Sequence, residues 1–536
     1  MKMRRWFGVL LFLCLSTLCF APYVFSGAQA EPAGEVQKTL IVSMAGDADT
    51  LDPHVTGARR AYTIMMNIFD TLVFRDVDGS YKPGLATEWS NTADGTVFTF
   101  KLKTGVTFHD GTPFNAEAVV YNLDRIVDPA IQSRFAANAI GPYKSSRALD
   151  DYTVEVAYES PIAPSVLLDA LSQAYLAMVS PTAAEKYGAD DFGRNPVGTG
   201  PFVFKEWTAQ NEVTLTRNDD YDWASPVFNH SGPAYLEQLT FITIPEASTR
   251  SATLETGESD IALELGEEAI ELLDEDPDFQ IVKGEVPGCP VILWMNTEHP
   301  ILSDLRVRKA ILHSFDQDLL ARTIFRGRVL PVKGPLGPGT WAYNPGVEQM
   351  YPYDLDAAAK LLDEAGWKLN SSTGIREKDG EPLAFDVNDI QEKRRIEFFQ
   401  AQMRMVGMDV DARAVTSDVL YAITREADTY SMASTWWAYS DPDVLRVLYH
   451  SSNVGTGFAI SRYKDPELDK MLEDALAELD TSKRLKRYYE IQEFIMDMAL
   501  TVPVYARLVH DGLKANITGY RNDRGQYPVL FDVQFE

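Results

Sequence analysis

Three aspartates follow the first apolar stretch of the chain and could bind a metal ion or act as acid and base. Residues 45–54 read AGDADTLDPH, which places Asp47, Asp49 and Asp52 close together. A calcium loop needs oxygen ligands at alternate positions and then a glycine. Asp47 and Asp49 fit, but the next alternate position is Leu51 and no glycine follows it. We expect no metal site here and interpret the aspartates as loop-shaping residues, with Asp49 as a candidate ligand contact.

The motifs of common exported hydrolases are missing. The seven histidines form no His-Glu-x-x-His motif, and the chain has no Gly-x-Ser-x-Gly elbow and no Gly-x-x-x-x-Gly-Lys-Ser/Thr loop. His109-Asp110 resembles an acid–base pair, but Asp110-Gly111 is a turn dipeptide, which favours a structural role. The 78 acidic residues allow a glycosidase carboxylate pair without indicating one. We predict that the protein is not an enzyme, with a secreted hydrolase as the alternative.

The first thirty residues have the pattern of a secretory signal peptide. A basic start is followed by the apolar stretch 6–20 and by small residues at Ala28 and Ala30. This pattern predicts export to the periplasm and cleavage after Ala30. A membrane anchor is the alternative, but the apolar stretch is short for a bilayer. Cleavage would leave Cys289 as the single cysteine, so no internal disulfide could form.

The negative charge of the chain argues against polyanionic partners. The formal net charge is −29 at pH 7, and loss of the three basic residues before position 30 would move it to −32. Such a chain repels nucleic acids and anionic lipids. No later segment approaches eighteen uninterrupted apolar residues. We expect a soluble, monomeric mature protein without a cofactor.

Strands and helices alternate along the whole chain. The apolar, β-branched stretch 39–44 predicts a buried strand, and apolar residues at helical spacing from 61 to 72 predict a helix after the aspartate loop. Further strands are expected at 97–102, 153–158, 213–217 and 239–244, helices at 468–479 and 491–498, helix caps at Asn115, Asp304 and Asp354, and a helix stop at Gly366. This pattern and the length of 536 residues indicate an α/β protein of two or three lobes.

Six stretches in order resemble one protein family. They are Leu51-Asp52-Pro53; 85–126 with FKLKTGVTFHDGTPFNAE at 100–117; PVGTGPFVF at 196–204 followed by RNDDY at 217–221; LWMNTEHPILSDLRVRKAILHSFD at 293–316; YDLDAAAKLLDEAGW at 353–367; and SDPD at 440–443. One stretch alone would be a weak signal, but together they cover nearly the whole mature chain. They resemble the family 5, peptide-type solute-binding proteins of ABC importers, which include the dipeptide, oligopeptide, nickel and glutathione receptors.

This resemblance implies a two-lobed, periplasmic-binding-protein-like α/β fold (type II, cluster C) with an extra subdomain in lobe I. The expected boundaries are 38–287 and 503–536 for lobe I, about 80–190 for the inserted subdomain, 288–502 for lobe II, and crossover strands near 285–292 and 500–506. The resemblance also implies that a solute binds in the cleft and that the lobes close over it by hinge motion. A membrane permease and an ATPase are the implied partners.

The resemblance predicts the ligand less directly than the fold. Dipeptide receptors hold the amino group of the ligand with an aspartate between a tryptophan and an Asp-Pro pair, and its carboxylate with an arginine just before a helix. Here, residues 435–442 have no acidic residue between the tryptophans and Asp441. The stretch that corresponds to the arginine, residues 385–391, contains no arginine, and the first basic residue after it is Lys393. We expect a peptide or peptide-like solute, with an oligosaccharide, an opine or a metal chelate as alternatives.

The candidate contacts are aromatic and charged residues near the expected cleft. Aromatic faces could stack on side chains, sugar rings or a cation. Trp436 and Trp437 would point to opposite faces of a strand, so at most one of them would line the cleft. The substrate-binding candidates are Asp49, Arg59, Tyr62, Trp294, Asn296, Asn388, Asp389, Trp436, Trp437, Tyr439 and Asp441.

Overall fold

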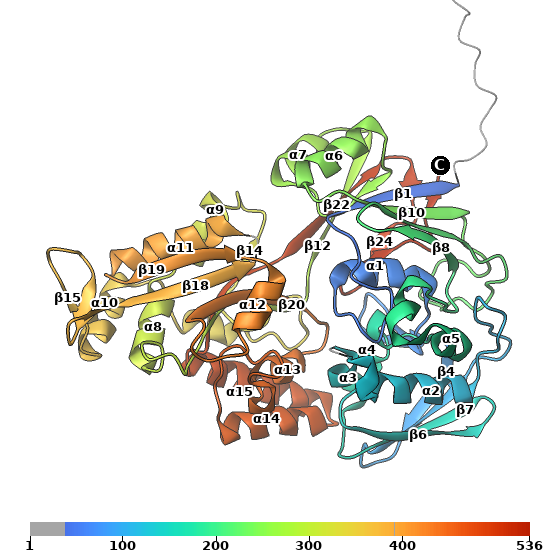
Figure 1. The fold of residues 1–536 in the computed structure, drawn as a ribbon, viewed down its shortest axis with the longest axis horizontal. Helices are drawn as coiled ribbons and strands as arrows, with labels where there is room; N and C mark the ends of the chain where they lie inside the picture. The colour runs from blue at the N-terminus through green and yellow to red at the C-terminus, as the bar shows by residue number, and fades with distance from the viewer. Residues whose placement is uncertain (1–37, 134, 391) are drawn as a thin grey trace, which may run out of the picture. The chain divides into compact units, whose positions relative to one another are not determined.

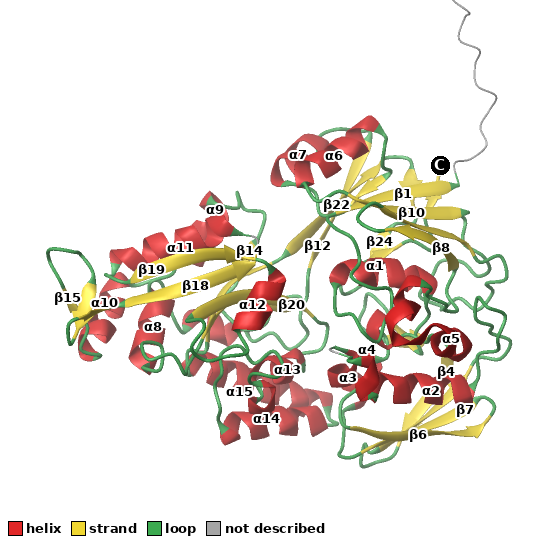
Figure 2. Ribbon diagram, in the orientation of Figure 1, coloured by secondary structure: helices red, strands yellow, loops and turns green. Residues whose placement is uncertain are grey.

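The computed structural model describes residues 38–133, 135–390 and 392–536. The predicted signal peptide and its cleavage after Ala30 lie outside these residues. Within the described ranges, no helix is long and apolar enough to cross a membrane. The strands form two large sheets and a smaller four-stranded sheet, with helices packed around them (Figure 1, Figure 2).

The first large sheet has seven strands. Their order is β12 (Phe279–Glu285), β22 (Leu508–Lys514), β11 (Ile261–Ala262), β1 (Thr39–Met44), β10 (Gln238–Thr243), β9 (Glu212–Arg217) and β8 (Phe202–Thr208). The central strand β1 pairs in parallel with both β10 and β11. Its helices are α1 (Arg59–Ile68), α6 (Ala247–Thr256) and α7 (Glu267–Leu273). The strands predicted at 39–44, 213–217 and 239–244 are therefore confirmed.

The second large sheet has six strands. Their order is β14 (Leu330–Pro331), β21 (Thr501–Ala506), β13 (Gly288–Met295), β20 (Met432–Ala438), β18 (Ala384–Ile390) and β19 (Asp409–Val415). Strand β13 is buried along its whole length. Its side chains alternate between two cores, with Leu293 in one and Ile292 in the other. This explains why β13 reads as a continuous apolar run.

Helices cover both faces of this second sheet. On one side they are α8 (Leu305–His313), α9 (Gln317–Thr323), α10 (Leu355–Glu364) and α11 (Lys393–Met405); on the other they are α12 (Ser417–Ile423), α13 (Val444–Tyr449), α14 (Pro466–Ala477) and α15 (Thr481–Asp497). The predicted caps are confirmed: Asp304 accepts from Arg306 N at 2.9 Å, and Asp354 from Ala357 N at 2.9 Å. Gly366 follows α10 with φ +92°, a conformation that favours glycine at a helix end.

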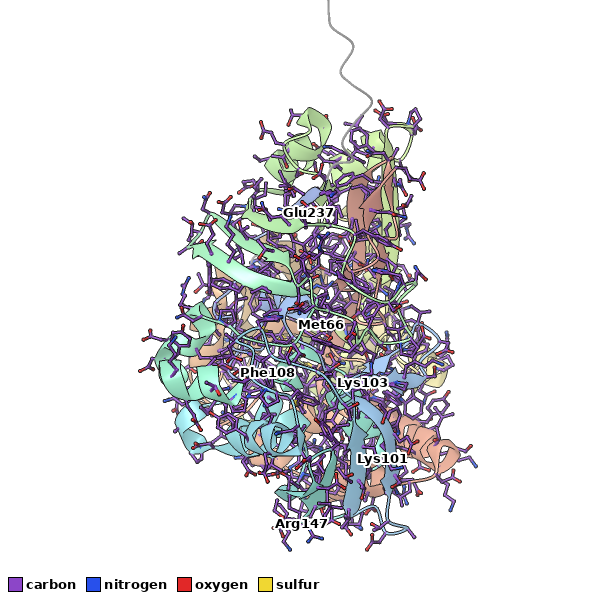
Figure 3. All side chains as sticks on the ribbon, turned by 90° about the vertical axis from the view of Figure 1, so that its right-hand side faces the viewer. Met66, Lys101, Lys103, Phe108, Arg147 and Glu237 are labelled. Atoms are coloured by element: carbon purple, nitrogen blue, oxygen red, sulfur yellow. The ribbon has the colours of Figure 1, made fainter. Side chains whose placement is uncertain are left out.

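A four-stranded antiparallel sheet is inserted into the first half of the chain. Its order is β4 (Ala86–Asn91), β5 (Val97–Leu102), β7 (Thr153–Tyr158) and β6 (Tyr143–Asp150). Around it lie α2 (Ala116–Val127), α3 (Ala136–Ala139), α4 (Pro164–Ala170) and α5 (Pro181–Asp191). Lys101 of β5 and Arg147 of β6 mark this sheet in Figure 3, and Glu237, which directly precedes β10, marks the first sheet. Asn115 caps α2 as predicted, accepting from Ala118 N at 3.0 Å.

One small three-stranded sheet and three strand pairs complete the described fold. They are β2 (Val73–Arg75) with β3 (Tyr81–Pro83), β15 (Lys368–Leu369) with β16 (Arg376–Lys378) and β17 (Glu381–Pro382), β23 (Ile517–Thr518) with β26 (Gln534–Phe535), and β24 (Arg521–Asn522) with β25 (Pro528–Val529). The last pair encloses a C-terminal loop that matters for the site.

The chain crosses between the two large sheets twice. It leaves the first sheet between β12 and β13, where Gly288 has φ +107° and a Cβ would lie 2.4 Å from Trp437 O, so only glycine fits. It returns at Arg507, because β21 stays paired with β14 through Ala506, and this is later than the expected position 503. We name residues 38–287 and 507–536 lobe I, and residues 288–506 lobe II.

Candidate functional site

The three aspartates after β1 hold their loop in place. Each carboxylate has a partner within the protein: Asp47 accepts from Trp207 Nε1 at 2.9 Å, Asp49 accepts from Thr56 Oγ1 at 2.8 Å, and Asp52 pairs with Arg125 at 2.6 Å. The loop-shaping interpretation is confirmed for these contacts. Among the described residues, no group of His, Cys, Asp and Glu side chains is arranged to hold a metal ion. Asp49 is exposed and stays a candidate contact.

Arg59 and Tyr62 contact the loop between β24 and β25. The Arg59 guanidinium lies over the Tyr527 ring, 4.2 Å from its centroid, and donates to the backbone oxygens of Gly525, at 3.1 Å, and Gln526. The Tyr62 ring stacks on the same Tyr527 ring, with centroids 3.7 Å apart. The C-terminal loop of the protein therefore already packs against both of these candidate residues.

Trp294 and Asn296 lie in the core of this structure. Both are fully buried. The Trp294 indole N–H donates to Thr435 Oγ1 at 2.8 Å, and the Asn296 amide donates to Ala427 O at 2.7 Å and Tyr430 O at 3.0 Å. With their polar groups satisfied inside the core, neither side chain presents an atom to a solute.

Asn388 and Asp389 end β18 and are also buried. Asn388 donates to the carboxylate of Asp386. Asp389 forms a two-point ion pair with Arg395, with Nη2 2.7 Å from Oδ1 and Nε 2.8 Å from Oδ2. Burial raises the pKa of the Asp389 carboxyl, and Arg395 opposes that rise. An arginine therefore does stand beside this strand, but it lies inside α11, two residues past Lys393, and Asp389 neutralises its charge.

The paired tryptophans of β20 separate as strand alternation predicts. Trp436 packs against one core of the second sheet and Trp437 against the other. The Arg507 guanidinium lies over the Trp436 ring, 4.0 Å from its centroid. The Trp437 ring contacts Phe458, with centroids 5.1 Å apart. Both indoles are half-buried, so each remains a candidate contact.

Tyr439 and Asp441 lie in the segment that follows β20. The Tyr439 ring is buried and contacts the Phe135 ring of lobe I, with centroids 5.9 Å apart. Asp441 is bound by Arg484 of α15 at two points, 2.6 and 2.8 Å long. Burial alone would raise the pKa of the Asp441 carboxyl, but the Arg484 guanidinium holds it below its usual value. Asp441 is thus an ionised structural partner rather than a free anchor.

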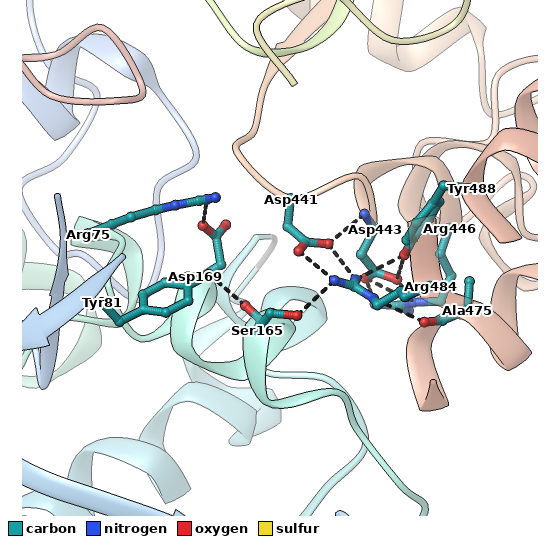
Figure 4. A network of polar contacts seen from close by, with 10 residues as sticks. All are labelled: Arg75, Tyr81, Ser165, Asp169, Asp441, Asp443, Arg446, Ala475, Arg484 and Tyr488. Carbon is teal, nitrogen blue, oxygen red and sulfur yellow. Dashed lines mark hydrogen bonds and ion pairs between the residues drawn. The ribbon is translucent and has the colours of Figure 1, made fainter. Parts of the chain in front are cut away.

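A polar network crosses between the lobes beside Asp441. Arg484 Nη1 donates to Ser165 Oγ of α4 at 2.9 Å, so lobe II contacts the inserted subdomain directly. Also on α4, Asp169 pairs with Arg75 of β2 (Figure 4). Its second oxygen is buried, and none of the residues that the structure describes pairs with it. Burial raises the pKa of the Asp169 carboxyl to about 6, and the negative charge of Asp441 adds to that rise. Two buried carboxylates therefore interact across the lobes.

A cavity adjoins this network and is a candidate site. Ser440 is its lobe II residue, and the rest of the lining comes from lobe I. The charged side chains are Arg75, Arg521, Arg524, Asp70 and Asp523, and the apolar ones include Met66, Phe74, Phe228 and Phe531. Figure 3 shows where Met66 of the lining lies, between the first sheet and the inserted sheet. A concave site with an apolar wall and a few charged groups suits a small amphipathic solute.

Asp70 is a satisfied part of the cavity wall. Its carboxylate accepts hydrogen bonds from Thr199 Oγ1 at 3.0 Å, Tyr221 OH at 3.1 Å and Trp223 Nε1 at 3.1 Å. Burial raises the pKa of the Asp70 carboxyl to about 6, and these donors limit the rise. Asp70, just after α1, therefore holds the end of this helix against Thr199, which precedes β8, and against Tyr221 and Trp223, which follow β9.

Tyr62 is the one sequence candidate that lines the cavity. Arg75, Ser440 and residues 521–531 were not predicted to take part, because they come from three distant parts of the chain. The stretch RNDRG at 521–525 was a usable signal, since it places two arginines and an aspartate within four residues.

Known proteins resemble this chain over nearly all its length. The glutathione-binding protein GsiB of Escherichia coli (strain K12) is 27% identical over 498 residues, which are 90% of this chain and 92% of that protein. The periplasmic binding protein DppA of Helicobacter pylori, solved with the peptide STSA, has a TM-score of 0.80 and 26% identity, covering 94% of this chain and 98% of that one. NikA of Brucella suis, solved with Fe(III)-EDTA, has a TM-score of 0.81 and 26% identity, covering 93% and 100%.

A match at the level of the family agrees with these individual likenesses. Residues 80–457 match the family described as bacterial extracellular solute-binding proteins, family 5 middle. The match runs from the inserted subdomain through most of lobe II and therefore includes more than half of the chain. The two-lobed α/β architecture predicted from the sequence is confirmed by the solved relatives. The chain belongs to the family 5 bacterial extracellular solute-binding proteins.

Proposed function

We propose that this protein captures a peptide or peptide-like solute between lobes I and II and delivers it to the permease of an ABC importer. The observation that carries the proposal is the cavity lined by lobe I residues and by Ser440 of lobe II, where charged and apolar side chains stand together. A peptide-like molecule needs both kinds of contact, because its ends are charged and its side chains are often apolar. The names of GsiB and DppA support the same ligand class.

The proposed place of action is the periplasm. The signal-peptide pattern of residues 1–30 supports export, and the net charge of −29 disfavours anionic surfaces and nucleic acids as ligands. In this role the protein works as a monomer and binds its solute without changing it. The division into lobes at residues 287 and 507 marks where we expect a hinge to bend.

Thermal unfolding of residues 31–536 against a panel of solutes tests the proposal. The panel contains glutathione, tri-alanine, maltotriose, agropinic acid and Fe(III)-EDTA, with free alanine as the matched control for the peptides. A ligand at a hundred times its dissociation constant adds about 2.7 kcal/mol to the free energy of unfolding, which raises the melting temperature by a few degrees. We expect glutathione or tri-alanine to raise it and maltotriose to leave it unchanged.

The opposite pattern would refute the ligand class. A shift with maltotriose or Fe(III)-EDTA alone would make this a receptor for a sugar or a chelate. Chromatography of the same mixtures shows whether any panel compound is consumed. Turnover of a bound compound would replace the receptor with an enzyme.

A further inference from the structure

Two arginines of the cavity have unused hydrogen-bonding capacity. Arg75 pairs with Asp169 through Nη1, but its Nε is buried without a partner among the described residues. Arg524 Nη1 lies 3.5 Å from Val77 O, at the edge of hydrogen-bond range. The Arg524 Nε is also buried, and no residue in ranges 38–133, 135–390 and 392–536 pairs with it. A guanidinium carries five N–H donors, and leaving a donor buried and unpaired is costly. Both side chains therefore favour an acceptor that the protein itself does not supply.

The two guanidinium groups also repel each other. Burial lowers the pKa of Arg524, and the positive charge of Arg75 is the next largest cause. Arg521 lines the same cavity and donates to Val227 O at 3.0 Å. Within the part of the chain that the structure describes, neither Arg521 nor Arg524 forms an ion pair. An anion placed among these groups would replace repulsion by attraction.

The carboxylates near the cavity offset this positive charge only in part. Asp70 is engaged by its three hydrogen-bond donors. Asp523 accepts from Tyr527 N at 2.9 Å, and burial raises the pKa of its carboxyl to about 6. It therefore carries slightly less negative charge near neutral pH than an exposed aspartate does. Neither carboxylate pairs with an arginine of the lining.

We propose that the cavity binds the carboxylate of the solute, with Arg524 and Arg75 as its hydrogen-bond donors. A planar carboxylate matches the forked N–H groups of a guanidinium, and such charge-assisted bonds are about twice as strong as neutral ones. Phe228 and Phe531 form the apolar wall beside the arginines, where a neighbouring side chain of the solute would pack. The inference rests on the proposed function and deepens it, because it places the acidic end of the solute on lobe I.

Calorimetric titration with matched acids and amides tests this assignment. Glutathione and tri-alanine are each compared with the derivative in which the C-terminal carboxylate is an amide. The variants are Arg524→Gln, which removes the charge, and Arg524→Lys, which keeps it without the fork. Arg147→Gln is the control, since Arg147 on β6 is 69% exposed and pairs with Glu155. Thermal unfolding of each variant without ligand verifies that it folds.

The expected result is a selective loss. In the wild type, the amide should bind about 10- to 100-fold more weakly than the acid. Arg524→Gln should weaken the acid by a similar factor and leave the amide unchanged, Arg524→Lys should recover part of the loss, and Arg147→Gln should behave as wild type. Equal affinities for acid and amide, or wild-type affinity in Arg524→Gln, would overturn the carboxylate site while the peptide receptor stands. Failure of both acids to bind would overturn the receptor and the site together.

Discussion

Two buried arginine clusters meet where the lobes touch, and they differ in how completely they are paired. In lobe II, each guanidinium nitrogen of Arg484 has an acceptor, supplied by Asp441, Ser165, Tyr488 and the Ala475 backbone (Figure 4). In lobe I, Arg75 has one hydrogen-bond partner within the described part of the chain, Asp169, and each of the two keeps a buried polar atom that no described residue satisfies.

How completely an arginine is paired distinguishes a structural role from a solute-binding role more clearly than its residue type does. A fully satisfied polar network rigidifies a core, whereas an incomplete one costs stability unless something else completes it. We therefore assign the Asp441–Arg484 pair to stability and the Arg75–Arg524 region to the solute. Four predictions follow from the comparison, in order of decreasing effect.

Arg484→Gln should destabilise the protein by about 3–5 kcal/mol. The substitution leaves the Asp441 carboxylate buried without its cation, and removing one member of a buried ion pair carries this cost. Urea unfolding of residues 31–536 measures it. Arg487→Gln is the matched control on the same helix. Arg487 is 40% exposed, and its nearest acidic partner, Glu478, lies 3.2 Å away. This substitution should therefore lower the free energy of unfolding by less than about 1 kcal/mol. Equal effects of the two substitutions would remove the structural role of Arg484.

Trp294→Phe should lower stability by about 1–3 kcal/mol and leave solute affinity unchanged. The substitution removes the buried hydrogen bond to Thr435 and part of a fully buried ring. Unfolding and calorimetry on the same preparation separate the two quantities. A loss of affinity with unchanged stability would restore Trp294 to the binding site.

Asp169 should make stability depend on pH by roughly 1–2 kcal/mol between pH 4 and 6. Its pKa is raised to about 6 in the folded protein, so the folded state keeps a proton that the unfolded state releases near pH 4. Rising pH therefore favours unfolding, and the stability of the wild type relative to Asp169→Asn should fall across this window. Urea unfolding of both proteins at several pH values measures the difference, and a constant or rising difference would contradict the raised pKa.

Arg524→Gln should change stability by less than about 0.5 kcal/mol in the absence of solute. No ion pair to a described residue is lost, and the repulsion from Arg75 is relieved. Thermal unfolding of the variant and the wild type without ligand measures this change in stability. A large loss would place Arg524 in the same structural class as Arg484 and weaken the comparison.

Local elements were predictable because their signals are local. The apolar stretch 39–44 forms the central strand of the first sheet, and Asn115, Asp304 and Asp354 cap helices, since spacing and side-chain type determine these features within a few residues. The order of the lobes followed from the family resemblance, which six separate stretches supported.

The site was less predictable because contacts distant in sequence decide it. Trp294 looked available beside a crossover strand, but Thr435 satisfies its indole N–H inside the core. Arg395 was not predicted because it lies inside α11, whereas the dipeptide-receptor pattern places the arginine just before the helix. The cavity joins α1, Ser440 and the C-terminal loop, and no periodicity in the sequence links those segments.

A crystal structure of residues 31–536 with the peptide of highest affinity tests the central claim most directly. We predict that the solute lies between lobe I and Ser440, with its carboxylate within hydrogen-bond distance of Arg524 or Arg75 and its side chain against Phe228 or Phe531. A peptide bound only to lobe II residues, with the cavity unchanged and its carboxylate on Arg395, would contradict the claim.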